Sequence, residues 1–363
     1  MKVLVLLSLL FPVLSFAQSN ETWHSFIDQS TDYKGFKNSN GVVMLQAKFG
    51  LFTIAKKFDK VMAVCEFQND STFQSYYLLK DGRKFGQDSL YIFDYMFACE
   101  SEGFIKFKNT KKDLTGFFNS NAKVAIPAEY NWASQIKNGV FVGLKNAEKN
   151  FWDKHEHSDC NHWSWEGGNM FLMDCNNNIL IENFEYSENL DFYSLKVSKE
   201  ISTDKTRVNF KGVNGKYYSF LDNEKAFEVY FSRLTNNLTL ENLIKNSFSK
   251  IVHFGEKGWT ADLCKDFFNK NGDLIIDRFE QLKNNNLEYS ITLEHYTPVP
   301  KNLNYIFDER KDNCGMLNIS KYPSFQVLIN FKDEKGEFSH QDKFTFIKVG
   351  KTYKLLSVGI KGI

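Results

Sequence analysis

The most unusual stretch of the chain is rich in histidine and tryptophan. Residues 151–165 hold three of the seven histidines and three of the six tryptophans. Within it, His155, His157, Asp159 and His162 supply imidazole and carboxylate groups, which are the ligands that zinc and copper take in proteins. These four residues are candidate ligands for a divalent transition metal. The chain otherwise predicts no cofactor.

The tryptophans of this stretch offer a second chemistry. Trp152, Trp163 and Trp165 can form an aromatic platform for a sugar or a protein partner, because aromatic side chains dominate such contacts. A third interpretation is a solvated loop whose tryptophans pack back onto the rest of the protein, tied by Cys160. Proximity along the chain does not show which side chains converge, so the sequence leaves the three interpretations open.

Acid–base candidates lie in the last third of the chain. They are His253, His295, Asp262 and Asp266. Their spacing matches no catalytic motif, and the sequence contains no G-x-S-x-G, P-loop, H-E-x-x-H or dinucleotide fingerprint. Cys264 follows His253 by 11 residues, a spacing for which a structural cysteine is the better interpretation than a nucleophile pair. The sequence therefore predicts no catalytic residue and favours a non-enzymatic protein.

The first residues have the features of an export signal. Lys2 precedes the apolar run 3–11, and Ser15 and Ala17 place small residues before a cleavage site. The apolar run is too short to cross roughly 30 Å of hydrocarbon. We therefore expect residues 1–17 to be a cleaved signal peptide. The mature protein is expected in the periplasm or outside the cell, without a transmembrane segment.

Six cysteines follow the predicted signal peptide, and disulfides are plausible in an oxidising compartment. Candidate pairs are Cys160 with Cys175, which closes the histidine-rich insertion, and Cys264 with Cys314, which staples the C-terminal part. Buried, reduced cysteines are the alternative. The absence of a C-x-x-C spacing disfavours a zinc ribbon.

Length and charge limit the class of protein. The chain has 363 residues, 42% of them apolar, and a formal net charge of +1. This composition excludes a disordered chain and a strongly basic nucleic-acid binder. The length indicates two domains. The expected partner is a protein or a glycan of the cell envelope.

The first half of the chain is internally similar. An apolar strand runs into a turn of glycine or asparagine at residues 76–82, 116–121 and 170–177. About a dozen residues after each turn comes an aromatic residue followed by a polar one, at Phe93, Tyr130 and Phe184, and Phe58 marks an earlier copy. Small units of this kind bury a shared apolar layer by stacking on their neighbours.

One copy resembles a known repeat family. Residues 114–118, 123–130 and 135–140 follow the pattern of a WG-type β-repeat, although Thr115–Gly116 stands where the family has Trp-Gly. The resemblance covers residues 34–200, with an insertion at 146–168. It implies a mainly β repeat array of short antiparallel strands that carries no catalytic residues. Such an array is a binding scaffold or a simple spacer.

From residue 225 onward the periodicity becomes helical. Apolar residues recur every three to four positions in 226–234 and 240–248, and Thr260 is expected to cap a helix over 261–269. Strands are expected at 289–296, 325–331, 344–349 and 353–358. This order predicts an α+β domain over 225–363 and resembles the NTF2-like fold, which often carries a pocket between helices and sheet.

These observations divide the chain into five segments. They are a signal peptide (1–17), a linker (18–33), the β array (34–200), a connector (201–224) and the α+β domain (225–363). The favoured function is a non-catalytic binding or interaction scaffold in the cell envelope. The alternative is a small-ligand-binding or hydrolytic pocket in the C-terminal domain.

Overall fold

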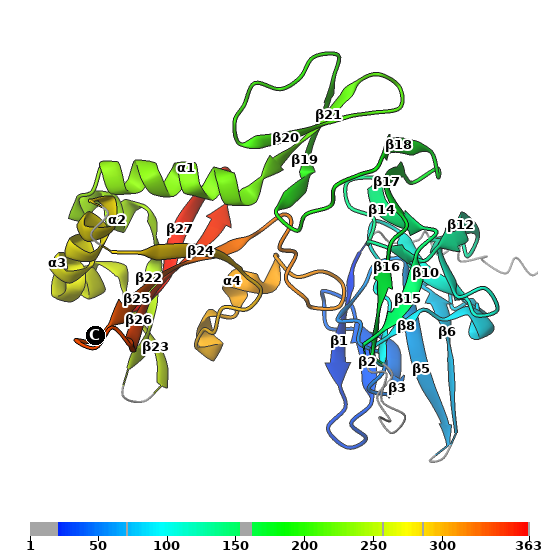
Figure 1. Ribbon diagram of the computed structural model, residues 1–363. Coiled ribbons are helices and arrows are strands. Elements are labelled where there is room, and N and C mark those ends of the chain that lie inside the picture. The colour runs from blue at the N-terminus through cyan, green and yellow to red at the C-terminus, as the bar shows by residue number, and fades with distance from the viewer. Residues whose placement is uncertain (1–20, 70–71, 153–161, 256–257, 285–286, 362–363) are drawn as a thin grey trace, which may run out of the picture.

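The computed structural model describes residues 21–69, 72–152, 162–255, 258–284 and 287–361. The structure is mostly β, with 49% of residues in strands and 15% in helices. The prediction of a β-rich chain is confirmed. A β part that ends at β21 is followed by a part with helices and one large sheet (Figure 1).

The β part consists of antiparallel sheets whose strands are mostly neighbours in sequence. The first has seven strands in the order β4-β1-β2-β3-β5-β6-β7, and the next are β10-β11-β12, β13-β14-β17-β18 and β19-β21-β20. Hairpins β8–β9 and β15–β16 form two further two-stranded sheets. The strand bounds are β1 Trp23–Ile27, β2 Lys34–Lys37, β3 Val43–Phe49, β4 Lys57–Phe58, β5 Val61–Asn69, β6 Thr72–Leu79, β7 Lys84–Phe85, β8 Ile92–Phe93, β9 Met96–Phe97, β10 Phe104–Asn109, β11 Leu114–Asn119, β12 Val124–Tyr130, β13 Trp132–Ala133, β14 Val140–Lys145, β15 Glu148–Phe151, β16 Trp163–Glu166, β17 Asn169–Asp174, β18 Ile179–Glu182, β19 Leu190–Ser198, β20 Arg207–Lys211 and β21 Tyr217–Asp222.

Successive sheets share their apolar layers. Side chains alternate between the two faces of a strand, and in β11 Phe118 stacks on Phe107 at 4.2 Å between ring centroids, within the cluster that also contains residues of β5 and β6. The neighbouring Phe117 contacts Phe141 of β14 at 5.2 Å in the next cluster. Val142 of β14 faces a third cluster, shared with β19 and β21. The middle sheets are therefore buried on both faces by their neighbours.

The four aromatic positions expected to be equivalent are not all alike. Phe58 and Tyr130 are fully buried and Phe184 is 2% exposed, each in a different cluster. Phe93 is 62% exposed, and Phe97 occupies the core of that unit instead. The short hairpin β8–β9 turns Phe93 outward, so the pattern of an aromatic followed by a polar residue does not predict its burial.

The β part is longer than predicted. The range 201–224, expected to be a connector, contains β20 and β21, which pair with each other and with β19. At the other end, β1 lies within the expected linker 18–33 and pairs with β2 and β4. Asp222 ends β21 and also caps the first helix, accepting hydrogen bonds from the backbone N–H groups of Glu224 and Lys225.

The C-terminal part is built on one six-stranded sheet in the order β23-β22-β27-β26-β25-β24. Only β22 and β27 are parallel; the other neighbours are antiparallel. The elements are α1 Asn223–Asn236, α2 Leu240–Lys245, β22 Ser247–Gly255, β23 Gly258–Leu263, α3 Cys264–Lys283, β24 Tyr289–Glu294, α4 Tyr305–Asp308, β25 Ser324–Lys332, β26 Phe338–Val349 and β27 Thr352–Gly359, with a short 3-10 turn at Lys301–Leu303. A second 3-10 turn, Gln87–Ser89, lies in the β part between β7 and β8.

Aromatic side chains fill the space between this sheet and helices α1 and α3. Phe227 of α1 stacks on Phe325 of β25 at 4.8 Å, and Phe231 meets Phe279 of α3 edge to face at 5.6 Å. All four belong to one buried cluster. A smaller cluster, which includes Phe307 of α4, packs with residues of β22, β26 and β27. Side chains thus fill most of the space between the helices and the sheet, and a cavity of about 530 Å³ remains beside the edge strand, lined by residues of α1, α3 and β24.

One predicted helix start is wrong. Thr260 does not cap a helix but lies in β23, where it pairs with His253 of β22. Helix α3 begins at Cys264 and runs for 20 residues. The helical periodicity expected over 240–248 holds only as far as Lys245, where α2 ends. Phe248 lies in β22, so the hairpin β22–β23 was not predicted. The four later strands lie where the sequence predicts them, although β26 begins at Phe338, before the start expected at residue 344.

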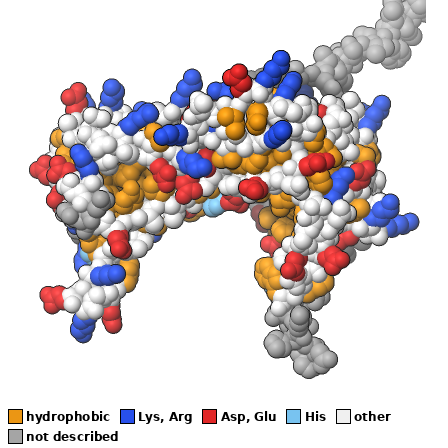
Figure 2. Space-filling model, turned by 45° about the horizontal axis from the view of Figure 1, so that its top comes forward, with side chains coloured by type: hydrophobic (Ala, Val, Ile, Leu, Met, Phe, Trp, Pro, Cys, Tyr) orange, Lys and Arg blue, Asp and Glu red, His pale blue; other side chains and the backbone are white. Residues whose placement is uncertain are grey.

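Two links join the β part to the C-terminal part. One link is the passage from β21 directly into α1, and the other is the segment 308–321 of the C-terminal part, which lies against the β part. Within that segment Cys314 forms a disulfide with Cys99. The space-filling view shows an arch with a hollow between its two legs (Figure 2).

Buried Glu100 gives the β part a pH-dependent stability. Its carboxylate is 5% exposed and accepts hydrogen bonds from the backbone N–H groups of Lys60, Val61 and Gly103. Burial, with a smaller contribution from Asp59, raises the pKa of Glu100 to about 7. The Glu100 carboxyl therefore binds its proton more tightly in the folded state than in the unfolded state.

We expect this contribution to stability to be complete below pH 4.5 and to be lost as the pH rises through 7. Its size is about 3 kcal/mol at most, from about 1.4 kcal/mol per pKa unit. Urea unfolding at pH 5 and pH 8 measures it. In Glu100→Gln the difference between the two pH values should shrink; an unchanged difference contradicts the assignment to Glu100.

Candidate functional site

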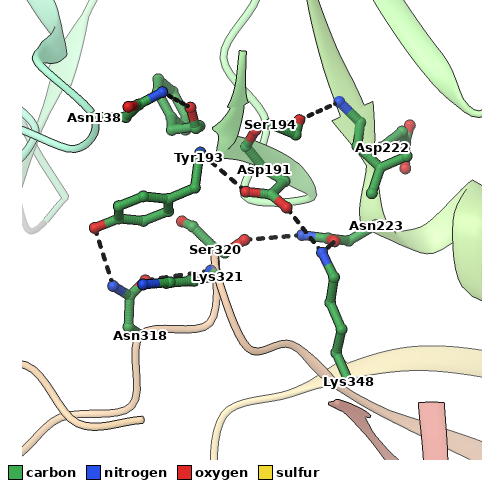
Figure 3. Close-up of polar contacts among 12 residues, drawn as sticks. Asn138, Asp191, Tyr193, Ser194, Asp222, Asn223, Asn318, Ser320, Lys321 and Lys348 are labelled. Atoms are coloured by element: carbon green, nitrogen blue, oxygen red, sulfur yellow. Dashed lines mark hydrogen bonds and ion pairs between the residues drawn. The ribbon is translucent and has the colours of Figure 1, made fainter. Parts of the chain in front are cut away.

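The junction between the two parts contains a buried ion pair. Lys348 of β26 donates to Asp191 of β19 at 2.8 Å and to the side-chain oxygen of Asn223, at the start of α1, at 3.0 Å (Figure 3). Asp191 is 6% exposed, Lys348 is 8% exposed and Asn223 is fully buried. A charge in such a place must be paired, so the ion pair holds β19 and β26 in one arrangement.

Further hydrogen bonds tie the segment around Ser320 into the same junction. The Asn223 side-chain amide donates to the backbone oxygen of Ser320 at 3.2 Å. Tyr193, whose backbone N–H donates to Asp191 at 2.9 Å, accepts a hydrogen bond at its hydroxyl from Asn318 at 3.2 Å (Figure 3). Four chain segments far apart in sequence therefore meet at one set of polar groups.

A cavity of about 670 Å³ lies beside this ion pair. Its walls come from the last sheet of the β part, from helix α1 and from the turn between β26 and β27. The residues that line it are Asp191, Tyr193, Ser194, Asp204, Thr206, Leu221, Ala226, Val229, Tyr230, Arg233, Lys348, Gly350, Lys351, Thr352 and Tyr353. Cavities of this size are typical of small-molecule sites.

Three groups on the cavity wall are not engaged elsewhere in the described part of the chain. The hydroxyl oxygen of Tyr230 is buried and has no hydrogen-bond partner, and burial raises its pKa, so the hydroxyl is neutral. Arg233 and Lys351 are exposed, and neither forms an ion pair with a described residue. By contrast, Asp204 accepts hydrogen bonds from Thr206, which lower the pKa of its carboxyl.

The polar groups at the back of the cavity serve structure rather than reaction. Ser194 donates to the backbone oxygen of Asp191 at 2.6 Å and accepts from the N–H of Leu221 at 2.7 Å. Its hydroxyl is therefore not poised next to a base, as nucleophilic catalysis requires. Buried Arg207 is likewise fixed on the backbone oxygen of Ser194 at 2.6 Å. This arrangement suits binding of a ligand better than attack on one.

The predicted aromatic platform is only partly a flat surface. Trp163 and Trp165 lie on β16 with their rings edge to face at 4.8 Å, and the ammonium of Lys149 covers Trp163 at 4.2 Å from its centroid. Trp152 is 67% exposed and stacks loosely on His162 at 6.1 Å. The structure thus leaves Trp152 mostly exposed, with its indole N–H donating to the Ser164 hydroxyl at 3.0 Å, and packs the other two tryptophans together.

Of the four predicted metal ligands, one lies within the described residues. His155, His157 and Asp159, with Cys160, lie outside the described residues. His162 is described and contacts Trp152. Within the described ranges, no group of three His, Cys, Asp or Glu side chains is placed to hold a metal ion.

The predicted acid–base residues are only partly brought together. His253 Nε2 lies 3.1 Å from a carboxylate oxygen of Asp262, across the hairpin β22–β23. His295 is 3.5 Å from Glu188 near the junction, and Asp266 lies in the first turn of α3. These groups belong to three separate places and do not form one site.

The predicted disulfide pairs are corrected by the structure. Cys314 is bonded to Cys99, not to Cys264, whose thiol is free and buried against α2. Cys175 also carries a free thiol. Fifteen pairings were open to six cysteines, and the choice among them depends on how the segment 308–321 lies against the β part.

The residues of the junction had no sequence signal. Asp191 and Lys348 are 157 positions apart and belong to no motif. Single charged residues within strands are ordinarily solvent-facing, and only the packing of the two parts buries these.

Comparisons of the chain with protein-family models, with curated proteins and with solved structures find no match. Among the described residues, no helix is both long and apolar enough to cross a membrane.

Proposed function

We propose that the chain is an exported, non-catalytic binding protein whose ligand site is the junction cavity. In this proposal the stacked sheets are WG-type repeats that serve as a rigid scaffold. The observation that carries the proposal is the unpartnered Tyr230 hydroxyl, buried at a cavity wall that also holds the unpaired cations Arg233 and Lys351.

The chemistry of the wall selects a ligand class. Lys348 is neutralised by Asp191, so Arg233 and Lys351 together outweigh the remaining carboxylate of Asp204. Tyr230 adds one hydrogen-bond donor, and Val229 and other apolar side chains add a non-polar surface. These features favour a small solute with an anionic group and a non-polar portion, because a buried donor left unpaired costs about 1–3 kcal/mol.

The C-terminal part retains its resemblance to the NTF2-like fold as a proposal. This proposal is supported by the packing of helices α1 and α3 on one face of a mostly antiparallel sheet. A cavity of about 530 Å³ remains between α1, α3 and β24, but none of the predicted acid–base residues lines it, which disfavours the hydrolytic alternative. In our proposal the ligand instead lies at the outer side of α1, where the β part supplies half of the wall.

The exposed end of hairpin β15–β16 supports a second contact. Phe151 is 47% exposed and Trp152 is 67% exposed, side by side in the sequence. Such aromatic groups are enriched where proteins meet sugars or other proteins. We propose this end as the place where a glycan or protein partner of the cell envelope contacts the chain.

Calorimetric titration tests the junction cavity directly. The probes are sodium salts of benzoate, phenyl phosphate, phenyl sulfate and benzenesulfonate, each of which joins an anionic group to a non-polar ring, titrated into the full mature chain. We expect at least one anion to bind, and Arg233→Gln with Lys351→Gln to weaken it at least tenfold. Tyr230→Phe should weaken it about fivefold, because one hydrogen bond contributes about 1 kcal/mol.

Matched control variants lie elsewhere on the surface. Arg83→Gln removes an exposed cation of the first sheet, and Tyr305→Phe removes an exposed hydroxyl of α4. Both should bind the anion like the unmodified protein. Equal affinity in the cavity variants and the controls, or no binding by any of the four anions, contradicts the proposal.

A further inference from the structure

A second cavity, of about 270 Å³, lies where the segment 308–321 meets the β part. It is separate from the junction cavity and shares none of its residues. The disulfide Cys99–Cys314 forms part of its wall. Its full lining is Ile54, Tyr91, Phe93, Met96, Phe97, Ala98, Cys99, Lys106, Gln135, Asp312, Cys314 and Met316. Aromatic, methionine and aliphatic side chains make up most of this lining.

Among the described residues that line this cavity, Lys106 of β10 is the one cation. Its ammonium lies over the ring of Tyr91 at 5.1 Å and that of Trp132 at 6.0 Å, and it forms no ion pair with a described residue. Burial lowers the pKa of Lys106 to about 8, with a smaller contribution from Lys137. A cation held among rings without an anion is unusual, because burying a charge is costly unless it is paired.

The one carboxylate on the wall is already engaged. Asp312 accepts hydrogen bonds from the backbone N–H groups of Cys314 and Met316, each at 2.9 Å. It is not paired with Lys106. Lys137, the other nearby cation, donates to the Ser320 hydroxyl at 2.8 Å. The ammonium of Lys106 is therefore left to an anion from outside the chain.

The rim of the cavity is apolar and accessible. Phe93 is 62% exposed, Met96 is 48% exposed and Met316 is 66% exposed. The hairpin that carries the first two turns through Asp94 and Tyr95, both at positive φ. Positive φ is costly for a bulky residue such as Tyr95, and such conformations cluster at functional sites. An apolar rim above a single cation matches a ligand with a non-polar tail and an anionic head.

We propose that this cavity binds a small amphiphilic carboxylate, whose carboxylate pairs with Lys106 and whose hydrocarbon portion lies against Phe93, Met96 and Met316. A charge-assisted hydrogen bond from an ammonium is stronger than a neutral one, and the aromatic surroundings exclude water that would weaken it. The volume has room for roughly ten non-hydrogen atoms, at about 30 Å³ each. A medium-chain fatty acid and an arylalkanoic acid both meet this description.

The test is titration of the full mature chain with sodium octanoate and sodium 3-phenylpropanoate, followed by calorimetry. Octanol and octyltrimethylammonium share the tail but lack the carboxylate. We expect a carboxylate to bind at least tenfold more tightly than either. Whichever of the two carboxylates binds more tightly shows whether the site prefers an alkyl or an aryl ligand, and binding of either one supports the proposal.

Variants of Lys106 test whether its ammonium binds the carboxylate of the ligand. Lys106→Met should weaken carboxylate binding at least tenfold and leave octanol binding unchanged, whereas Lys106→Arg should retain the carboxylate. Lys123→Met removes an exposed lysine of the same sheet and is the control. Octanoate binding that is unaffected by Lys106→Met, or equal binding of octanoate and octanol, overturns the proposal.

A measurement on the unmodified protein guards against a variant that fails to fold. Octanoate is ionised throughout pH 7–10, whereas the ammonium of Lys106 loses its proton in this range. Of the other groups near it, Tyr91 has a pKa raised by burial, Asp312 is a carboxylate, and Lys137 also has a pKa lowered by burial but bonds Ser320. Octanoate affinity should therefore fall severalfold from pH 7 to pH 10 while octanol affinity stays constant; a constant octanoate affinity overturns the proposal.

Discussion

Replacing Lys348 by methionine is expected to lower the free energy of unfolding by about 3–5 kcal/mol, because it leaves Asp191 charged and buried without its partner. Asp191 is 6% exposed, so water cannot replace the lost ammonium. The hydrogen bond from Lys348 to Asn223 is lost in the same variant. Urea unfolding followed by tryptophan fluorescence measures the change.

A double variant separates the lost pair from the lost volume. Asp191→Asn with Lys348→Met removes the buried charge but keeps an oxygen that accepts from the Tyr193 N–H. We expect it to recover most of the stability lost in the single variant. Arg83→Met breaks an exposed ion pair with Asp81 and should change the free energy of unfolding by less than about 1 kcal/mol. If Lys348→Met lowers the free energy of unfolding no more than Arg83→Met does, the buried pair has no structural role.

Loss of the disulfide is the second large effect that we expect. Cys99 and Cys314 are 215 positions apart, so their bond restricts a very long loop of the unfolded chain. The double variant Cys99→Ser with Cys314→Ser should lower the free energy of unfolding by about 2–5 kcal/mol, since constraint of the unfolded state grows with loop length. Thermal or urea unfolding of the oxidised protein and the variant gives the difference.

Two controls support the interpretation. Reduction of the unmodified protein with dithiothreitol should reproduce the instability of the double variant, and the variant itself should not respond to the reductant. Cys175→Ser changes a free thiol and should have little effect. If the oxidised and reduced proteins unfold at the same urea concentration, Cys99 and Cys314 do not restrain the chain.

Local patterns in the sequence were informative for the C-terminal strands. The alternation in 325–331 indicates β25, since a strand with one face in the core has a period of two. Strand β27 has no such alternation, because it lies between two buried clusters. The hairpin β22–β23 was not predicted, because its apolar residues follow directly on those of α2. Thr260 had the side chain of a helix cap, but sheet pairing with His253 decided its conformation.

The candidate sites were much less accessible to sequence reasoning. The tryptophans and histidines of 151–165 stood out by density, which says nothing about convergence, and the structure places Trp163 and Trp165 against Lys149. Lys106 carried no signal, because a lysine on a strand ordinarily points to solvent. Its surroundings include Tyr91 and Trp132, which the fold places beside it from neighbouring units.

The sequence alone determined that the chain is β-rich and that helices and a further sheet follow the short antiparallel strands, because these properties arise from periodicity among near neighbours. The tertiary structure alone decided that Cys314 meets Cys99, that Asp191 meets Lys348, and that Tyr230 and Lys106 line cavities. Those contacts join residues far apart in the chain. Burial of a charge or a hydroxyl is a property of how whole sheets and helices pack, and no local pattern contains it.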